Sequence, residues 1–179
     1  MGARHGQQVI EKLKDQPIEL WHRGRRVTDV TREPGIAGGV RSLAELYDLQ
    51  WRAPDVMLFD SPASGDKVGR SFMIPRTQAE LASLGEMMMR WARHTFGMMG
   101  RSPDYINRAI SAYAGGADFL AQQDRRFGDN ARRYHALARE NDWCLTHTLI
   151  NPQANRAVGP ARQADWPSRA RSTRDPRTS

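Results

Sequence analysis

At 179 residues, 39% of them hydrophobic, the chain is long enough to bury the core of one domain. Its single cysteine, Cys144, excludes an internal disulfide and any multi-cysteine metal or iron–sulfur site built by this chain alone, and fits a cytoplasmic protein. The formal charge of +7 is concentrated near the end, because six arginines and two aspartates follow Asn151. We therefore expect no nucleic-acid partner, and no apolar run approaches the roughly 18 residues of a membrane span.

The first 50 residues predict two helices separated by a hairpin. A short helix over residues 6–14 is stopped by Pro17. Two β-prone runs, residues 18–21 and 27–30, then flank a turn. A helix over residues 37–50 follows, and we expect its apolar face in the core; that face carries Val40, Leu43, Ala44 and Tyr47.

A second hairpin and a long helix come next. Residues 57–59 and 68–74 flank the turn-rich segment 61–66. Thr77 can cap a helix, and Glu80 completes a capping box. One stripe of this helix takes alternating three- and four-residue steps through Leu81, Leu84, Met88, Trp91 and Thr95.

Two further helices are predicted before the pattern is lost. Ser102, Pro103 and Asp104 form a typical helix start. The buried stripe expected for that helix is Ile106, Ile110, Tyr113, Ala117 and Leu120. Another helix is predicted over residues 129–141, and residues 143–150 are expected to be extended and half-buried.

Beyond Asn155 apolar periodicity disappears. Residues 156–179 are rich in Arg, Pro, Ser, Thr and Ala, so we expect a folded domain over residues 1–155 and a disordered Arg-rich tail over residues 156–179. Such an abrupt loss of pattern also suggests a truncated or out-of-frame coding region.

Two clusters of polar and aromatic residues suggest chemistry. Arg101 precedes a helix cap and Tyr105 lies in the first turn, so a cation, a phenol and free backbone N–H groups converge where negative charge could be stabilised. From the residues alone, Arg101 could equally be a surface residue and Tyr105 a core residue. His147 could likewise be a satisfied core histidine, and we expect no metal, since no second ligand has suitable spacing.

The same two clusters carry a family resemblance. Residues 100–107 (GRSPDYIN) and 146–153 (THTLINPQ) resemble two signature stretches in the amino-terminal domain of the 4-hydroxyphenylacetate 3-monooxygenase large component. Shorter matches support it, in order from about Gly6 to about Asn155: residues 27–30 (VTDV), 46–50 (LYDLQ), 71–77 (SFMIPRT) and 140–142 (END).

The resemblance implies a fold that is mainly α with short β-hairpins, namely the helical amino-terminal domain of an acyl-CoA-dehydrogenase-like architecture. The β domain and the carboxy-terminal helical bundle that builds homotetramers in complete members are missing. It also implies an FADH2-dependent monooxygenase that hydroxylates a phenol such as 4-hydroxyphenylacetate at the ortho position. In that family an NADH-dependent reductase supplies the flavin, and O2 forms a flavin C4a-hydroperoxide.

The site residues are carried over from the resemblance. Catalytic roles fall to Arg101, Tyr105 and His147, and His147 would hydrogen-bond the phenol oxygen. Substrate-binding residues would be Arg101, Ser102, Pro103, Asp104, Tyr105 and His147. Flavin-binding residues would be His147, Thr148, Leu149, Gln153, Ala154, Asn155 and Arg156.

The sequence leaves two other interpretations to consider. A 4-hydroxybutyryl-CoA dehydratase shares the fold but needs an iron–sulfur cluster held by several cysteines, which Cys144 alone cannot supply. A non-catalytic fragment whose basic tail binds nucleic acid or acidic partners is the alternative of a different class. Because the site has only one of its walls, we expect the isolated chain to be inactive.

Overall fold

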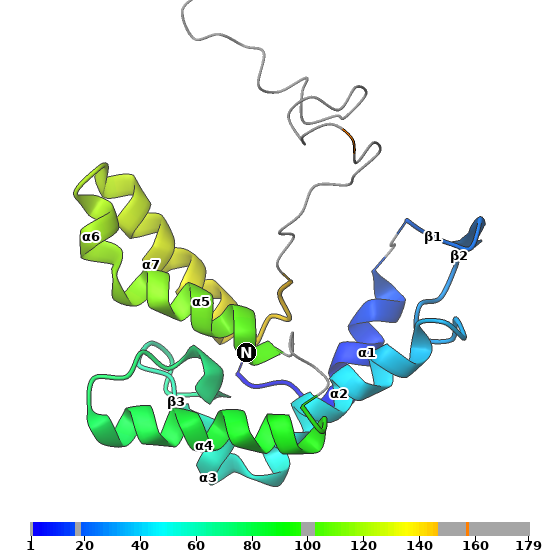
Figure 1. Cartoon of the computed structure of the whole chain (residues 1–179), viewed down its shortest axis with the longest axis horizontal. Helices are drawn as coiled ribbons and strands as arrows, with labels where there is room; N and C mark the ends of the chain where they lie inside the picture. Colours follow the sequence, from blue (N-terminus) through cyan, green and yellow to red (C-terminus); the bar gives the residue numbers. More distant parts are fainter. Residues whose placement is uncertain (1, 17–18, 98–102, 147–156, 158–179) are drawn as a thin grey trace, which may run out of the picture. The chain divides into compact units, whose positions relative to one another are not determined.

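Helices dominate the part of the chain that the computed structural model describes, which is residues 2–16, 19–97, 103–146 and 157 (Figure 1). The helices are α1 (Gly6–Asp15), α2 (Ala37–Arg52), α3 (Pro54–Met57), the 3-10 helix η1 (Arg70–Phe72), α4 (Gln78–His94), α5 (Pro103–Gly115), α6 (Ala117–Ala121) and α7 (Arg125–Glu140). Strands β1 (Leu20–His22) and β2 (Arg25–Val27) form one antiparallel hairpin, and β3 (Leu58–Asp60) and β4 (Lys67–Gly69) form another. The predicted mainly α fold with short hairpins is confirmed.

The first hairpin is tighter than predicted. Arg23 and Gly24 both have positive φ, 51° and 73°, which is the geometry of a two-residue type I′ turn. This turn lets His22 pair with Arg25, so residues assigned to the loop belong to the ladder. Gly24 adopts this backbone at little cost because it has no Cβ, whereas Arg23 adopts it despite its Cβ.

The second hairpin is shorter than predicted on its far side. Strand β4 stops at Gly69, and the chain turns into η1 instead of continuing to residue 74. Ser71 and Phe72 are adjacent and both fully buried. A strand would place consecutive side chains on opposite faces, whereas the 3-10 turn buries both.

Helix α4 begins as predicted and packs differently. Thr77 Oγ1 accepts from the Glu80 backbone N–H at 3.1 Å, and the Glu80 carboxylate accepts from the Thr77 N–H at 3.0 Å, so the capping box is confirmed. The core cluster formed by α2, α3 and α4 is Leu46, Met57, Leu84, Met87 and Trp91. Leu81, placed on the same stripe in the sequence, is 60% exposed.

The helix predicted after Ser102 is broken in two. It ends at Gly115, and α6 starts again after Gly116, whose N–H bonds to the Ala112 carbonyl at 2.9 Å. The expected single buried stripe is therefore wrong in part: Ala117 is buried, but in α6, and Tyr113 is 62% exposed.

Helix α7 is longer than predicted and lies against α5 and α6. It starts at Arg125, because the Asp124 carboxylate caps it by accepting from the Arg126 N–H at 2.8 Å. Gly128 makes the close approach to α6 possible: a Cβ there would lie 2.5 Å from the Ala117 carbonyl oxygen.

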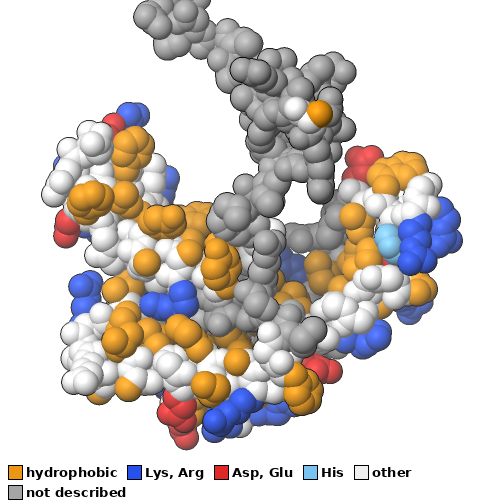
Figure 2. All heavy atoms as spheres, in the orientation of Figure 1, with side chains coloured by type: hydrophobic (Ala, Val, Ile, Leu, Met, Phe, Trp, Pro, Cys, Tyr) orange, Lys and Arg blue, Asp and Glu red, His pale blue; other side chains and the backbone are white. Residues whose placement is uncertain are grey.

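Many large apolar side chains remain on the surface of the described residues. Figure 2 shows hydrophobic patches spread over the helices. The most exposed of these residues are Trp21, Leu81, Phe96, Tyr113, Phe119 and Phe127.

Residues 1–146 cluster as one unit and residues 147–179 as a second. The predicted tail, residues 156–179, lies outside the described residues except for Ala157, as does the second half, residues 147–150, of the predicted extended segment 143–150. Within the described ranges no helix is long and apolar enough to cross a membrane.

Candidate functional site

The structure describes the approaches to the predicted site rather than its centre. Arg101, Ser102 and the whole of the predicted flavin-binding set, His147 to Arg156, lie outside the described residues. Pro103 and Asp104 open α5, and Tyr105 follows in its first turn. Tyr105 is 47% exposed, so its ring is not a core residue.

The start of α5 is fastened to η1. Asn107 is 1% exposed, and its Nδ2 donates to Ser71 Oγ at 3.0 Å. The Arg108 guanidinium donates to the backbone carbonyls of Ser71, at 2.8 Å, and Met73. These bonds join two of the stretches that carry the family resemblance, residues 71–77 and 100–107. They fix the position of the turn that presents Tyr105.

A buried carboxylate marks the other approach. Asp142 lies one residue beyond Asn141, the C-cap of α7; it has a φ of 45° and is 3% exposed. Its Oδ2 accepts from the Arg4 backbone N–H at 2.9 Å and from Gln50 Nε2 at 2.9 Å. Its backbone carbonyl accepts from Arg4 Nε at 3.0 Å and from the Tyr47 hydroxyl at 3.3 Å. We call Arg4, Tyr47, Gln50 and Asp142 the Asp142 clasp.

The clasp also joins stretches that are distant in sequence. It brings residues 140–142 to residues 46–50, and both belong to the resemblance. Arg4 additionally lies over the ring of Tyr47, 4.9 Å from its centroid. Burial raises the pKa of Asp142 despite the bonds from Arg4 and Gln50, and it raises the pKa of Tyr47, which remains a neutral phenol.

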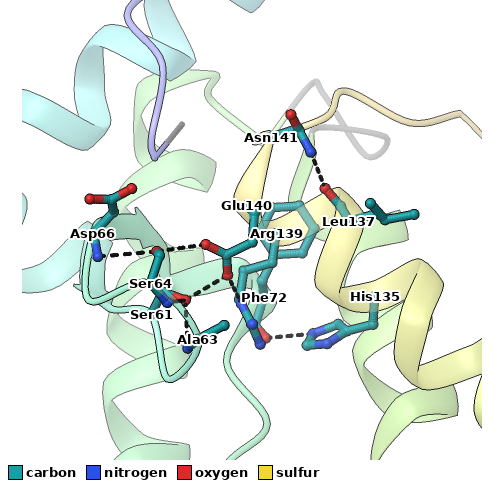
Figure 3. Close-up of polar contacts among 10 residues, drawn as sticks. All are labelled: Ser61, Ala63, Ser64, Asp66, Phe72, His135, Leu137, Arg139, Glu140 and Asn141. Atoms are coloured by element: carbon teal, nitrogen blue, oxygen red, sulfur yellow. Dashed lines mark hydrogen bonds and ion pairs between the residues drawn. The ribbon is translucent and has the colours of Figure 1, made fainter.

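Glu140 and His135 complete the polar contacts of this end of α7 (Figure 3). The Glu140 carboxylate accepts from Ser61 Oγ at 2.5 Å, Arg139 Nε at 2.7 Å and Ser64 Oγ at 2.8 Å. Partial burial opposes ionisation of Glu140, but together these bonds outweigh it and lower its pKa. Glu140 therefore holds the β3–β4 loop to α7 as a charged acceptor.

His135 links α7 to η1 through a hydrogen bond with the Phe72 backbone. Its Nε2 lies 2.8 Å from the Phe72 carbonyl oxygen, so this nitrogen must carry the proton, because a carbonyl only accepts. Burial lowers the pKa of His135, with further lowering from the Arg139 and Arg108 charges, although the bond to Phe72 opposes the change. The imidazole is therefore held in its neutral form.

A pocket of about 350 Å³ lies beside the segment that follows the clasp. It is formed by α1, α2 and residues 143–145, and its lining is Arg4, Val9, Lys12, Leu13, Gln16, Leu43, Trp143, Cys144 and Leu145. Its walls are mainly apolar, with the cationic side chains of Arg4 and Lys12. A pocket of this kind suits an apolar or aromatic group that carries negative charge.

Among the described residues, no group of three or more His, Cys, Asp or Glu side chains is placed to hold a metal ion.

Comparison with known families decides the relationship. A family model described as "4-hydroxyphenylacetate 3-hydroxylase N terminal" matches residues 5–174. The chain belongs to this family. The resemblance noted in the sequence is thereby confirmed, and four of the motifs that carry it are joined in pairs by the Asp142 clasp and by the Asn107–Ser71 contact.

The family relatives are much longer proteins. The oxygenase component of 4-hydroxyphenylacetate 3-monooxygenase from Geobacillus sp. (strain PA-9) is 44% identical over 92% of this chain and 33% of its own length. The Thermus thermophilus protein of the same name is 42% identical over 91% of this chain and 33% of its own length. The chain thus spans about one third of the curated relatives it matches.

Comparison with solved structures supports the same family assignment. A crystal structure of an oxygenase component (HpaB) complexed with FAD and 4-hydroxyphenylacetate superposes with a TM-score of 0.80 at 42% identity, over 91% of this chain and 33% of that one. An archaeal 4-hydroxybutyryl-CoA dehydratase from N. maritimus gives a TM-score of 0.74 at 20% identity, over 91% of this chain and 32% of that one. The second match shows a shared fold alone.

Sequence reasoning missed part of this site. Tyr47, Gln50 and Asp142 lie in motifs that carry the resemblance, but nothing in the sequence indicates that Asp142 meets the other two. No sequence pattern indicated a role for Arg4, because it precedes the first helix and its contact with Asp142 joins residues 138 positions apart.

Proposed function

We propose that this chain is the amino-terminal part of the oxygenase component of a two-component, reduced-flavin-dependent monooxygenase that hydroxylates a phenol. The family match over residues 5–174 carries the proposal. The FAD-bound relative with a TM-score of 0.80 supports the cofactor, and the 4-hydroxyphenylacetate bound to that relative supports a substrate resembling it. The partner is a flavin reductase that uses NADH, and one cysteine fits action in the cytoplasm.

Bound FADH2 supplies the activation of O2 for transfer of one oxygen atom to the ring. The chain's own residues manage the phenol. His147 hydrogen-bonds the phenol oxygen and accepts its proton, which makes the ring more reactive toward an electrophilic oxygen. Arg101 and the start of α5 stabilise the negative charge that develops nearby. The exposed ring of Tyr105 orients the substrate from the first turn of that helix.

The residues that would hold the flavin are His147, Thr148, Leu149, Gln153, Ala154, Asn155 and Arg156. The observation of this structure that fits them is the mainly apolar pocket beside residues 143–145 with its two cationic side chains, since a flavin combines an aromatic ring with anionic phosphates. The match covers 33% of the Geobacillus relative, so the proposed activity also draws on the part of that relative outside the match.

The proposal is tested by anaerobic titration of the full chain with FADH2, followed by absorbance and flavin fluorescence. Saturable binding that 4-hydroxyphenylacetate strengthens is expected, because substrate and flavin would share the walls at His147. Mixing with oxygenated buffer and a phenol then tests for a catechol by chromatography. Absence of any FADH2 binding, both by the chain alone and by a chimera carrying a relative's remaining two thirds, would contradict the proposal.

A further inference from the structure

The Asp142 clasp is an unusual way to end a helix. Backbone at positive φ after a helix is usually occupied by Gly, which adopts it at little cost, and only occasionally by Asn or Asp. Asp142 instead puts a carboxylate at this position and buries it to 3% exposure, and burying a charge is unfavourable unless it is paired and hydrogen-bonded. The position therefore demands a role for the carboxylate beyond stopping α7.

The bonds of the carboxylate show what it holds. Oδ2 takes one N–H from the segment before α1 (Arg4) and one from α2 (Gln50), each at 2.9 Å. Gly69 of β4 closes the same space, because a Cβ there would lie 2.7 Å from Gln50 Oε1 and 3.4 Å from Asp142 Oδ1. Three separate stretches of chain thus converge on Asp142, just after the end of α7.

The backbone that follows Asp142 is also held in place by contacts of its own. The Trp143 N–H bonds back to the Ala138 carbonyl at 3.0 Å, and the Trp143 ring meets the Tyr134 ring edge-on at 6.1 Å. Residues 143–145 then line the pocket beside α1 and α2. His147 follows Thr146 directly in the sequence.

We propose that Asp142 is a positioning residue of the oxygenase site: held by Arg4 and Gln50, its carboxylate fixes the path of residues 143–146 and so the point from which His147 and the flavin-binding stretch depart. This inference rests on the function proposed above. Asp142 does not touch substrate or flavin. Its effect passes through the backbone that it anchors.

Two substitutions separate positioning from simple stabilisation. In Asp142→Asn, an amide oxygen takes the place of Oδ2, so both hydrogen bonds remain, and Asn tolerates positive φ. In Asp142→Ala both bonds are lost, and buried N–H groups of Arg4 and Gln50 lose their acceptor. Gln50→Met keeps the shape of the side chain and removes one of the two donors, which gives a milder variant should Asp142→Ala fail to fold.

The experiment uses the full chain in two measurements, hydrogen exchange by mass spectrometry and anaerobic FADH2 titration. For Asp142→Ala we expect faster exchange of residues 143–146, unchanged exchange of α4, and FADH2 affinity weakened about tenfold, as expected for the loss of acceptors to buried donors. Gln50→Met is expected to change the exchange of residues 143–146 and the FADH2 affinity in the same direction, but by less. Asp142→Asn is expected to keep both quantities close to their wild-type values. Leu84→Ala is the matched control: it lowers global stability in the α4 core but leaves FADH2 affinity unchanged while the chain is folded.

Each of these measurements can support or overturn the positioning role of Asp142. The positioning role is overturned if Asp142→Ala keeps wild-type FADH2 affinity, if Asp142→Asn is as impaired as Asp142→Ala, or if Leu84→Ala weakens flavin binding equally. If the wild-type chain binds no FADH2, the proposed function fails for the chain alone, and the exchange of residues 143–146 then tests the clasp by itself. Unchanged exchange in Asp142→Ala would overturn the clasp as an anchor, whatever the flavin does.

Discussion

Single residues of this protein reveal their roles through partners that are remote in sequence. His135 is the clearest titratable example, because it is buried in α7 and its Nε2–H donates to the Phe72 carbonyl of η1. Burial holds its pKa below the usual 6.5. The neutral imidazole is therefore part of the folded structure.

The lowered pKa of His135 predicts a loss of stability on acidification. A histidine whose pKa is lowered by folding contributes stability that is present above its unfolded pKa of about 6.5 and is lost as pH falls toward the folded value. We expect the free energy of unfolding, measured with urea, to fall between pH 7.5 and pH 5.5 by more in wild type than in His135→Gln.

The variant isolates this effect from an opposing one. The pKa of Asp142 is raised by burial, so its contribution to stability increases as pH falls, with the opposite sign. Asp142 is present in both proteins, and its effect cancels in the difference. Equal pH dependence of wild type and His135→Gln would show that His135 is not held neutral.

At the scale of the element, α4 shows why an apolar stripe does not by itself identify a buried face. Leu84 is 1% exposed and Leu81 is 60% exposed, although both belong to the predicted stripe. Leu84→Ala is expected to destabilise the fold by about 2–5 kcal/mol, because it opens a cavity in the core cluster.

Leu81→Ala provides the control on the same helix. It removes the same atoms from an exposed site and is expected to change stability by no more than about 0.5 kcal/mol. The two free energies of unfolding come from urea denaturation followed by circular dichroism. Similar values for both variants would contradict the packing of α4 described here.

The α6–α7 contact gives a second matched pair. Gly128→Ala would place a Cβ 2.5 Å from the Ala117 carbonyl oxygen and 2.9 Å from Ala121 Cβ. Helix α7 must move to accept it, and we expect destabilisation of about 1–3 kcal/mol.

Gly85→Ala, in α4, has no atom within 4 Å of the added Cβ. It is expected to stabilise the fold by about 0.5–1 kcal/mol through helix propensity alone. Thermal unfolding of the two variants should therefore move the midpoint in opposite directions. Stabilisation by both substitutions would mean that α6 and α7 are not in close contact at Gly128.

At the scale of the whole molecule, the chain covers 33% of its Geobacillus relative, so catalysis is best examined with the remaining two thirds in place. A chimera that joins residues 1–157 of this chain to that remainder is expected to hydroxylate 4-hydroxyphenylacetate when supplied with FADH2. His147→Ala in the chimera should reduce catechol formation by about 100-fold or more, the usual contribution of a general acid or base.

His94→Ala is the control for this substitution. His94 lies on α4 beside Glu45, 3.2 Å away, and takes no part in the proposed site. Product formation is measured by chromatography, and oxygen consumption reports how much O2 is used without product. A His147→Ala chimera that couples oxygen to product as well as the parent would contradict the role of this histidine.

The sequence by itself determined what depends on neighbours along the chain. The Thr77–Glu80 capping box, the presence of two hairpins and the extents of α1 and α2 follow from caps, turns and periodicity, which act within a few residues. The family also followed from the sequence, because its motifs are contiguous stretches. Chemical roles for Arg101, Tyr105 and His147 were predicted from those motifs, and of the three the structure describes Tyr105.

The tertiary structure decided what depends on contacts between distant segments. Leu81 and Leu84 are the same residue type and belong to the same predicted stripe. Only the location of α2 and α3 makes Leu84 buried and Leu81 exposed. The Asp142 clasp is the strongest case, since Arg4, Gln50 and Asp142 meet only after α1, α2 and α7 have packed. Burial and long-range hydrogen bonding are properties of the folded chain, so no local sequence pattern could have predicted them.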